Sequence, residues 1–561
     1  MKENKIVLDT MASALFFLAG SFLRKTVWLS VVAFCLISCS ASSQVPLTTL
    51  DEAQDNAASA AEAFSRCHRF VEGWLTVADP ATGLIPRNIK GGSFAESMQG
   101  DSYWNAKDAA ADNYPFMVIT AYLTDPDLLE GRMKEMLSTE TRLTSCLGAC
   151  PATYDFRTQQ LRNHPVDTGT VIFGSAEYVK DGLLPITELM GPSPWSDRMV
   201  SILDDLHKLV SVALPGKNLN GAEAIEVNGD LLQALSRVYW FTGDESYLDW
   251  VLQIGDYYLL GEIQPADYDS IQLRDHGCEF ILGLCELYAT LSVVRPEKRE
   301  QYKAPLHRLL DRILETGRNE DGLFYNRINP SSGAILDRGI ADTWGYSLDG
   351  YYTVYLLDGT ESYRDAVVQV LGNLGKYRNH LWQSKGPSDG YADAIESALN
   401  LYNRERSAST AAWLDSEIRV MYSFQRENGI IEGWHGDGNF ARTALMYALW
   451  KTRGTHISPW REDVLFGAVE KGDGILLTLT AGNAWEGKLY FDIPRHRDYL
   501  HLPFDWPRIN QFPEWFTVER DRTYIVKVDG KKTRYSGADL SQGLSLSVKA
   551  GQTVVMEILG K

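Results

Sequence analysis

Carboxylates, histidines, arginines and tryptophans recur at one structural phase along the middle of the chain, just before stretches that are apolar on nearly every side. Carboxylates that share a cavity shift each other's pKa values, so that one serves as a general acid and another as a base. Aromatic rings beside them suit the C–H faces of sugar rings. Two carboxyl groups across the scissile bond, with rings that hold the sugar, are what glycosidic cleavage requires.

Three aspartates are the first candidates for the acid and the base, and three further carboxylates are held in reserve: Asp112, Asp275 and Asp342, then Glu226, Glu396 and Asp437. Candidate substrate-binding residues lie in the same segments: Trp104, Lys107, Asn113, Tyr114, Arg274, His276, Trp344, Tyr346, Trp434, His435, Asn439 and Arg442. An arginine fork binds a carboxylate in a bidentate way, so Arg274 and Arg442, with Lys107, favour a uronate as substrate. Structural alternatives stay open: helix caps for the aspartates, core packing for the tryptophans and salt bridges for the arginines.

The alternation of two helix types predicts the scaffold that positions these residues. Amphipathic stretches such as 195–214 alternate with stretches that are apolar nearly all round, such as 278–291. A helix that is apolar on every side is buried on every side, whereas one with a polar face lies outside. The segments 241–247 and 357–363 repeat one joint, in which Gly ends a helix and an acidic–Ser–Tyr stretch opens the next.

We therefore expect a mainly α fold, an (α/α)6-type toroid of six or seven helix pairs over residues 55–457. An open solenoid is the alternative. After Pro459 the chain changes to short β-branched stretches, with a hairpin signal at Asp529-Gly530. This change predicts a small C-terminal antiparallel β-sandwich over 458–561, and the aromatic stretch 502–516 is expected to pack on the helical domain.

Residues 1–38 have the pattern of a secretory signal, with Arg24-Lys25 before an apolar run. The run ends in Leu36-Ile37-Ser38-Cys39, which resembles the bacterial lipobox. That resemblance implies lipidation of Cys39, a tether over 39–54 and a lipid anchor in the bacterial cell envelope, in the periplasm or on the outer-membrane surface. An uncleaved anchor helix is the alternative, but the run is short for a bilayer span of about 20 residues.

The composition narrows the range of partners. The 561 residues include 54 Lys and Arg against 73 Asp and Glu, a net charge of −19, which gives no general reason to bind nucleic acid. The sequence carries no nucleotide-binding glycine motif and no zinc-ligand spacing, so neither a cofactor nor a metal is expected. Cys146 and Cys150 can pair in an oxidising compartment or stay as thiols, and Cys278 and Cys285 are expected in the core. The oligomeric state stays open.

Three segments carry a resemblance to a known family: residues 104–116, 393–401 and 434–445. With them, residues 55–561 resemble bacterial carbohydrate-active enzymes that have an (α/α) toroid followed by a β-sandwich. The chain looks most like the exo-acting β-glucuronidases of glycoside hydrolase family 154. This resemblance implies removal of a terminal glucuronate from a polysaccharide side chain or an oligosaccharide. The candidate site residues rest on their loop positions, because no catalytic assignment is transferred from the family.

Other classes remain open beside this interpretation. Polysaccharide lyases on similar toroids abstract the C5 proton of a uronate with a Tyr or His base, which would be His276, His435, Tyr346 or Tyr391 here. Unsaturated glucuronyl hydrolases share the helical barrel but usually lack the sandwich, and they use Asp residues. The surplus of carboxylates favours hydrolysis over elimination. A surface glycan-binding lipoprotein without catalysis is a third class, but it needs aromatic platforms on an open face.

Overall fold

The computed structural model describes residues 48–89, 102–216, 219–383, 387–431 and 435–560. The predicted signal segment 1–38, the predicted lipidation residue Cys39 and the candidate residue Trp434 lie outside the described residues. The chain divides into two compact units, residues 1–52 and 53–561, and the second contains both the helices that carry the candidate site and the C-terminal sheets. Within the described ranges, no helix has the length and apolar character needed to span a bilayer.

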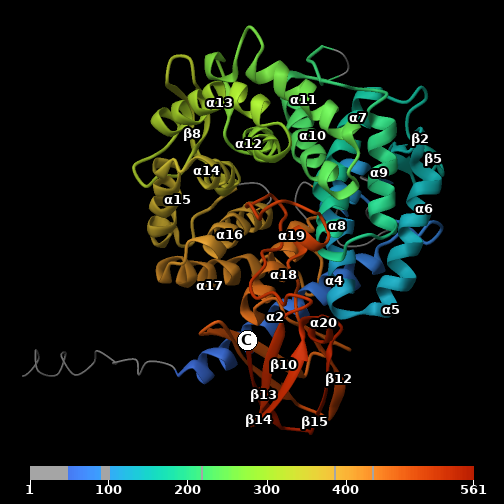
Figure 1. Cartoon of the computed structure of the whole chain (residues 1–561). Helices are drawn as coiled ribbons and strands as arrows, with labels where there is room; N and C mark the ends of the chain where they lie inside the picture. The colour runs from blue at the N-terminus through green and yellow to red at the C-terminus, as the bar shows by residue number, and fades with distance from the viewer. Residues whose placement is uncertain (1–47, 90–101, 217–218, 384–386, 432–434, 561) are drawn as a thin grey trace, which may run out of the picture. The chain divides into compact units, whose positions relative to one another are not determined.

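Two sets of helices alternate along the chain (Figure 1). The inner set comprises η1 (Ala106–Asn113) with α4 (Tyr114–Thr124), α7 (Thr168–Glu177) with η3 (Tyr178–Leu183) and α8 (Leu184–Met190), α10 (Gly221–Thr242), α12 (Cys278–Val294), α14 (Trp344–Asp358), α16 (Pro387–Arg404) and α18 (Asn439–Thr452). The outer set comprises α2 (Thr49–Thr76), α6 (Lys134–Thr144), α9 (Pro194–Leu206), α11 (Glu245–Leu259), α13 (Pro296–Thr316), α15 (Glu361–Asn373) and α17 (Ala408–Tyr422). Short turns between them are α5 (Pro126–Leu128), η2 (Leu129–Met133), η4 (Pro265–Asp267) and η5 (Leu374–Tyr377).

The inner helices form a closed ring. Neighbours contact each other in chain order from α10 through α12, α14 and α16 to α18, and α18 contacts α4. The circle is completed because α4 contacts α8 and α7 contacts α10. The predicted toroid is confirmed in this respect, and the open-solenoid alternative is wrong.

Burial explains why the two sets differ. Every residue of α18 is buried, whereas α13 buries a single stripe: Tyr302, Leu306, Leu309, Leu310 and Ile313. Spacings of three and four residues place such a stripe on one face of a helix, and the charged remainder faces solvent. The sequence pattern thus assigned the inner and outer positions correctly for these two helices.

The predicted helix joints are present, and a Tyr–Asp hydrogen bond recurs between the outer helices. Gly243 and Gly359 end α10 and α14 in the left-handed conformation, with φ of 71° and 67°. Tyr247 and Tyr363 follow these joints, and each is buried and donates a hydrogen bond to an Asp of the preceding outer helix, Asp204 (2.7 Å) and Asp311 (2.8 Å). Tyr302 inside α13 makes the same bond to Asp256 of α11 (2.7 Å). Consecutive outer helices from α9 to α15 are therefore tied together by the same bond.

The C-terminal part consists of two antiparallel sheets. The strands are β9 (His456–Ser458), β10 (Val464–Lys471), β11 (Gly474–Ala481), β12 (Trp485–Tyr490), β13 (Thr523–Val528), β14 (Lys531–Ser536), β15 (Leu544–Val548) and β16 (Thr553–Gly560), with α19 (Arg495–Asp498) and α20 (Gly537–Ser541) between them. One sheet has the order β10-β11-β16-β13-β14 and the other β15-β12-β9. Asp529 and Gly530, both with positive φ, form the predicted hairpin turn between β13 and β14.

Short strands decorate the helical part in small antiparallel sheets: β1 (Tyr103–Trp104) with β4 (Tyr154–Asp155) and β5 (Gln160–Leu161), β2 (Ser145–Leu147) with β3 (Cys150–Pro151), and β6 (Ile271–Gln272) with β7 (Tyr325–Asn329) and β8 (Ala334–Ile340). The five cysteines within the described ranges are free thiols. Cys146 Sγ lies 3.6 Å from the backbone oxygen of Cys150, so the two are neighbours without a disulfide. Cys278 and Cys285 are buried on α12, as expected.

The segment between α19 and β13 leaves the sheets and enters the helical ring. Trp506 Nε1 donates to Glu286 of α12 (3.1 Å), and Asn400 of α16 donates to the backbone oxygen of Arg508 (3.1 Å). Trp506 and Arg508 are buried there among inner helices. The expectation that the aromatic stretch 502–516 packs on the helical domain is confirmed, and the segment reaches as far as the candidate site.

Candidate active site

A pocket of about 450 Å³ lies where most of the inner helices begin. Its charged lining residues are Arg87, Lys107, Asp108, Asp112, Glu177, Lys180, Asp181, Glu226, Arg274, Asp275, His276, Glu279, Asp342, Asp389, Asp393, His435 and Arg442. Tyr346, Gln383, Asn439 and Ile509 complete the lining. The start of a helix offers free N–H groups and the positive end of its dipole, which favours carboxylates at this end of the ring.

The structure brings most of the predicted site residues to this pocket: Asp112, Glu226, Asp275, Asp342, Lys107, Arg274, His276, Tyr346, His435, Asn439 and Arg442. The two remaining carboxylates, Glu396 and Asp437, are buried beside the pocket and do not line it. The lining residues come from segments that are far apart in the sequence, such as Asp112, Glu226 and Asp342, so the ring of helices is what assembles them.

The predicted aromatic platform does not form from Trp104 and Trp344. Both rings are buried, Trp104 with its edge against Tyr178, and neither lines the pocket. Asn113 is also fully buried, and Tyr114 donates to the backbone of Met133 away from the pocket. These side chains hold the helices together because large rings gain more from burial in the core than from exposure at a rim. Within the described lining, Tyr346 is the aromatic residue.

Asp342 and Asp275 have opposite protonation tendencies. Asp342 is buried directly before α14, and this burial raises the pKa of its carboxyl group to about 7, with Asp389 and Asp275 adding to the shift and Arg274 opposing it. The Asp275 side chain is 48% exposed. Burial acts to raise the pKa of Asp275, but the charges of His276, Arg274 and Lys180 together outweigh it and hold the pKa below its ordinary value. Near neutral pH, the pair offers one protonated and one ionised carboxyl group.

A second charged cluster surrounds His435. Its Nε2 lies 3.6 Å from the carboxylate of Asp112, and Asp108 is bound by Arg87 at 2.6 Å. Burial opposes the imidazolium form, but Asp112, Asp108 and Asp389 outweigh it and raise the pKa of His435 to about 9. His435 is therefore a cation at neutral pH, which makes it a donor and a poor base.

The two terminal nitrogens of Arg442 are bound by protein groups, whereas its buried Nε has no hydrogen-bond partner among the described residues. Its guanidinium donates to Asp393 (2.8 Å), Asn439 (3.0 Å) and Asn510 (2.9 Å), and it forms an ion pair with Glu396 (2.9 Å). A guanidinium with this many partners has little capacity left for a substrate carboxylate. Arg442 therefore positions the neighbouring side chains of the pocket.

Asn510 belongs to the segment that enters the ring, and it joins three charged groups. Its backbone N–H donates to Glu396 (2.6 Å), its Nδ2 donates to Asp181 (2.7 Å), and its Oδ1 accepts from Arg442. Asn510 has a φ of 60°, a left-handed conformation that Asn tolerates better than most residues. Its neighbour Ile509 lines the pocket from the C-terminal part of the chain, and we call this side of the pocket its floor.

Several lining residues were missed by the sequence reasoning. Glu177, Lys180 and Asp181 lie at the i, i+3 and i+4 positions of an otherwise apolar helix, a signal that is visible in the sequence. Glu177 is the last residue of α7, and Lys180 and Asp181 lie in η3, a π-helical stretch that contacts the π-helical η1 with Lys107 and Asp112. π-Helical turns are rare and often mark functional sites. No sequence pattern indicated that Arg87, Gln383 or Ile509 would line the pocket.

Two groups of side chains are close enough to share a cation: Asp108, Asp112 and His435, and Glu226, Asp275 and His276. A histidine binds a metal ion in its neutral form. The raised pKa of His435 thus favours an ion-paired cluster in the first group. In the second group, Nδ1 of His276 contacts Glu226, and its Nε2 lies 3.6 Å from Asp275.

No family model matches this chain, and no curated protein matches it. Among solved structures, it is similar to a variant α-1,6-mannanase of Salegentibacter sp. HEL1_6 in complex with α-1,6-mannotriose, with 15% identity over 49% of this chain and 88% of that chain and a TM-score of 0.37. It is also similar to a family 76 mannosidase of Bacteroides thetaiotaomicron, with 12% identity over 71% of this chain and 98% of that one and a TM-score of 0.37. A sugar epimerase from a ruminal bacterium has 12% identity over 57% and 87% of the two chains and a TM-score of 0.38. These likenesses are too low to carry an activity to this chain.

Proposed function

We propose that this protein is a glycoside hydrolase that removes a terminal uronic acid, a β-glucuronate, from a polysaccharide or an oligosaccharide. One observation carries the proposal: Asp342 and Asp275 line the same pocket with opposite protonation tendencies, and Arg274 influences both. A glycosidase needs one carboxylic acid that gives a proton to the leaving oxygen and one carboxylate on the other side of the bond.

In this mechanism Asp342 is the general acid. Its pKa of about 7 leaves a large fraction protonated at neutral pH, and this form donates its proton to the glycosidic oxygen as the C–O bond breaks. Asp275, which is ionised and half-exposed, either removes a proton from the attacking water or attacks the anomeric carbon itself. The separation of the two carboxyl groups around bound substrate decides between inversion and retention of configuration.

Arg274 supports recognition of a uronate. It lines the pocket, and within the described residues no hydrogen bond or ion pair engages its guanidinium. Lys107 also lines the pocket, and its ammonium group lies 4.3 Å from the centre of the Phe173 ring. These two cations are available to a substrate carboxylate, whereas Arg442 is bound to protein groups.

The lyase alternative has less support from the same geometry. Elimination needs a Tyr or His base, but the hydroxyl group of Tyr346 donates to Asp393 (2.9 Å), and burial raises the pKa of Tyr346 well above its ordinary value. His435 is protonated near neutral pH, and Tyr391 is buried outside the pocket lining. These observations disfavour Tyr346, His435 and Tyr391 as the base, which leaves His276 in the pocket lining as the candidate base for elimination.

The test is release of 4-nitrophenol from 4-nitrophenyl β-glucuronide by the full chain, with 4-nitrophenyl α-mannoside as the comparison substrate. We expect turnover of the glucuronide and little of the mannoside. Faster turnover of the mannoside would contradict the uronate assignment. With a uronate-bearing polysaccharide, ultraviolet absorbance from a new C4–C5 double bond would show a lyase, and affinity with no product would show a glycan-binding protein.

We also propose that the chain is a lipoprotein anchored through Cys39 in the cell envelope. The support is the sequence ending Leu36-Ile37-Ser38-Cys39 after a short apolar run. Metabolic labelling with a palmitate analogue in a bacterial host tests it. Label is expected in the wild type and absent from Cys39→Ser, and equal labelling of both would contradict the anchor.

A further inference from the structure

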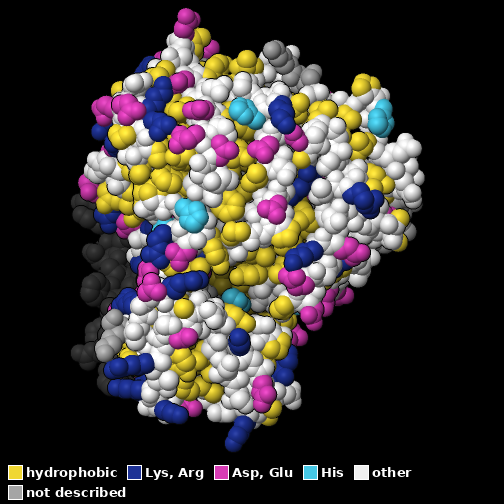
Figure 2. Space-filling model, turned by 45° about the vertical axis from the view of Figure 1, so that its right-hand side comes forward, with side chains coloured by type: hydrophobic (Ala, Val, Ile, Leu, Met, Phe, Trp, Pro, Cys, Tyr) yellow, Lys and Arg dark blue, Asp and Glu magenta, His cyan; other side chains and the backbone are white. Residues whose placement is uncertain are grey.

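A second and larger hollow lies where the helical ring meets the C-terminal sheets. It has a volume of about 1000 Å³. Its lining includes Tyr122, His456, Tyr490, Arg497, Tyr499 and Arg520. We call it the junction groove. It shares no lining residue with the active-site pocket, and its helical wall comes from the C-terminal ends of α4, α8 and α18. Figure 2 shows a hollow between the helical part and the sheet part, with Lys and Arg side chains beside it.

Partly exposed aromatic rings form one wall of the junction groove. The rings of His456 and Tyr490 are stacked, with centroids 5.0 Å apart and planes within 8°. Tyr122 lies 6.0 Å from His456, and burial lowers the pKa of His456 to about 4, so that this ring is neutral near pH 7. A neutral, flat surface of this kind suits the C–H face of a pyranose ring.

Tyr499 is held at the same wall by a backbone feature. Gly191 ends α8 with a φ of 74°, and a Cβ atom at that position would come within 2.8 Å of the Tyr499 ring. Only glycine permits this close approach together with this backbone conformation. The ring therefore has a fixed place against the end of α8.

The rim of the groove adds charged groups. Arg497 is paired with Asp498 and Glu519, but within the described residues no hydrogen bond or ion pair engages the side chain of Arg520. Arg522 and Asp521 are exposed next to it. In a chain with a net charge of −19, an unpaired arginine at the edge of an aromatic hollow is available to an anionic ligand. Asp521 can accept hydrogen bonds from hydroxyl groups.

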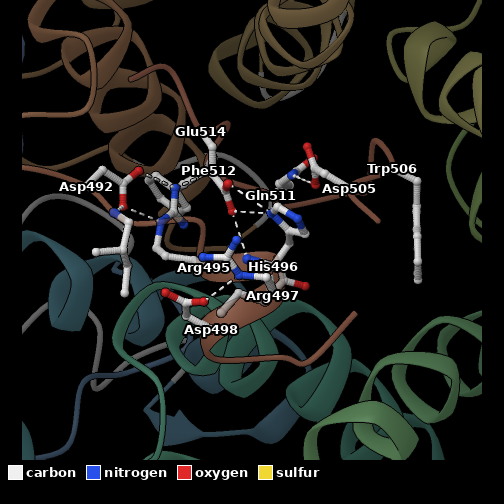
Figure 3. Close-up of polar contacts among 12 residues, drawn as sticks. Asp492, Arg495, His496, Arg497, Asp498, Asp505, Trp506, Gln511, Phe512 and Glu514 are labelled. Carbon is white, nitrogen blue, oxygen red and sulfur yellow. Dashed lines mark hydrogen bonds and ion pairs between the residues drawn. The ribbon is translucent and has the colours of Figure 1, made fainter. Parts of the chain in front are cut away.

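Buried ion pairs hold this wall rigid (Figure 3). Arg495 donates to Asp492 (2.8 and 3.1 Å) and to the backbone oxygen of Phe512 (2.7 Å), and the backbone of His496 donates to Glu514 (2.8 Å). These bonds fix α19, which carries Arg497 and precedes Tyr499. A ligand would lose less entropy on binding to a surface that is already ordered.

We propose that the junction groove is a second carbohydrate-binding site, which takes a segment of a uronate-bearing polysaccharide at a distance from the active-site pocket. The stacked His456 and Tyr490 rings and Tyr499 contact sugar rings, and Arg520 binds a carboxylate. The volume is at the upper end of small-molecule sites, which is room for more than one sugar unit. The choice of a uronate, unlike the saccharide class, rests on the proposed function.

The test measures the affinity of the full chain for soluble glucuronoxylan and for neutral dextran by calorimetry, and separately its turnover of 4-nitrophenyl β-glucuronide. Arg520→Ala and Tyr499→Ala are the variants, and Arg534→Ala on the exposed face of β14 is the matched control. We expect Arg520→Ala and Tyr499→Ala each to weaken glucuronoxylan binding about tenfold, while turnover of the small glucuronide stays within twofold of wild type. The control should leave both unchanged.

Arg520→Ala changes an exposed side chain and leaves folding intact. If its affinity for glucuronoxylan equals that of the wild type, the proposal that the junction groove binds carbohydrate is wrong, even if Tyr499→Ala misfolds. Equal affinity for dextran would overturn the uronate assignment of the groove. If the chain turns over no glucuronide and Arg520→Ala still weakens glucuronoxylan binding, the groove stands and the proposed function fails. If turnover is present and binding is insensitive to both substitutions, the proposed function stands and the groove fails.

Discussion

The two ends of the helical ring carry different chemistry. Where most inner helices begin, the active-site pocket gathers carboxylates such as Asp275, Asp342 and Asp389. Where α4, α8 and α18 end, the junction groove adds tyrosines, and its carboxylates are matched in number by arginines. Helix starts present N–H groups and partial positive charge, which offset the repulsion among clustered carboxylates, and helix ends favour cations. Under the two proposals above, the polarity of the helices separates bond cleavage at one end of the ring from glycan binding at the other.

The largest effect is expected from removal of Asp342, the proposed general acid of the active-site pocket. Asp342→Asn should lower kcat/KM for the small glucuronide by about 10²–10⁴-fold, because the amide cannot give a proton to the leaving oxygen. Asp249→Asn on the exposed face of α11 is the matched control and should be neutral. Initial rates of nitrophenol release measure both. Near wild-type turnover of Asp342→Asn and of Asp275→Asn would remove the acid and base assignment.

The two ends of the ring should also differ in how much the removal of an arginine lowers the free energy of unfolding. Arg442→Ala leaves Glu396 and Asp393 buried without their cation, which is expected to lower the free energy of unfolding by about 3–5 kcal/mol. Arg520→Ala at the junction groove should change it by less than about 0.5 kcal/mol, since that side chain is exposed. Urea denaturation followed by circular dichroism measures the difference. Equal losses in the two variants would break the contrast.

The floor of the pocket depends on the C-terminal segment. Asn510→Gly keeps the left-handed backbone but removes the side-chain bonds to Asp181 and Arg442, and we expect a loss of about 2 kcal/mol in the free energy of unfolding. Asn379→Gly is the matched control, an exposed Asn with a φ of 55°. The same denaturation experiment applies. A loss no larger than that of the control would show that Asn510 does not hold these charged groups in solution.

The pH profile tests the raised pKa of Asp342. The acid works only when protonated, so kcat/KM should fall about tenfold per pH unit above pH 7. Asp275 must be ionised, and its lowered pKa puts the opposite limb below the ordinary Asp value of about 3.9. Rates measured between pH 4 and pH 9 should therefore show a fall on the alkaline side alone. A profile that rises above pH 7 would instead favour a base that loses its proton there.

Much of the scaffold could be predicted from sequence because burial leaves a local record. The apolar stretch at 278–291 and the Gly243 and Gly359 joints identified inner helices and their ends correctly. The same reasoning brought Asp275 and Asp342 to a common pocket through their phase before inner helices. It failed for Trp104, because a ring before a helix has the same local sequence whether it faces the core or the pocket.

Membership of glycoside hydrolase family 154 stays a prediction, since no family model matches the chain. Glu177, Lys180 and Asp181 were missed although their spacing marks one face of a helix, because that helix pair carried no motif before its start. Asn510 could not have been found at all. It meets Arg442 across 68 residues of sequence and Glu396 across 114, and only the fold brings them together.

The sequence by itself determined most of the inner helices, the glycine joints that end α10 and α14, and several of the carboxylates near the helix starts, but it missed α7 and α8. Apolar periodicity and helix caps are local, so they can be read from neighbouring residues. Only the tertiary structure decided which carboxyl group is protonated, which arginine is free and which is bound, and that the C-terminal segment closes the floor of the pocket. Those properties depend on desolvation and on charges contributed by distant segments, and no stretch of sequence contains them.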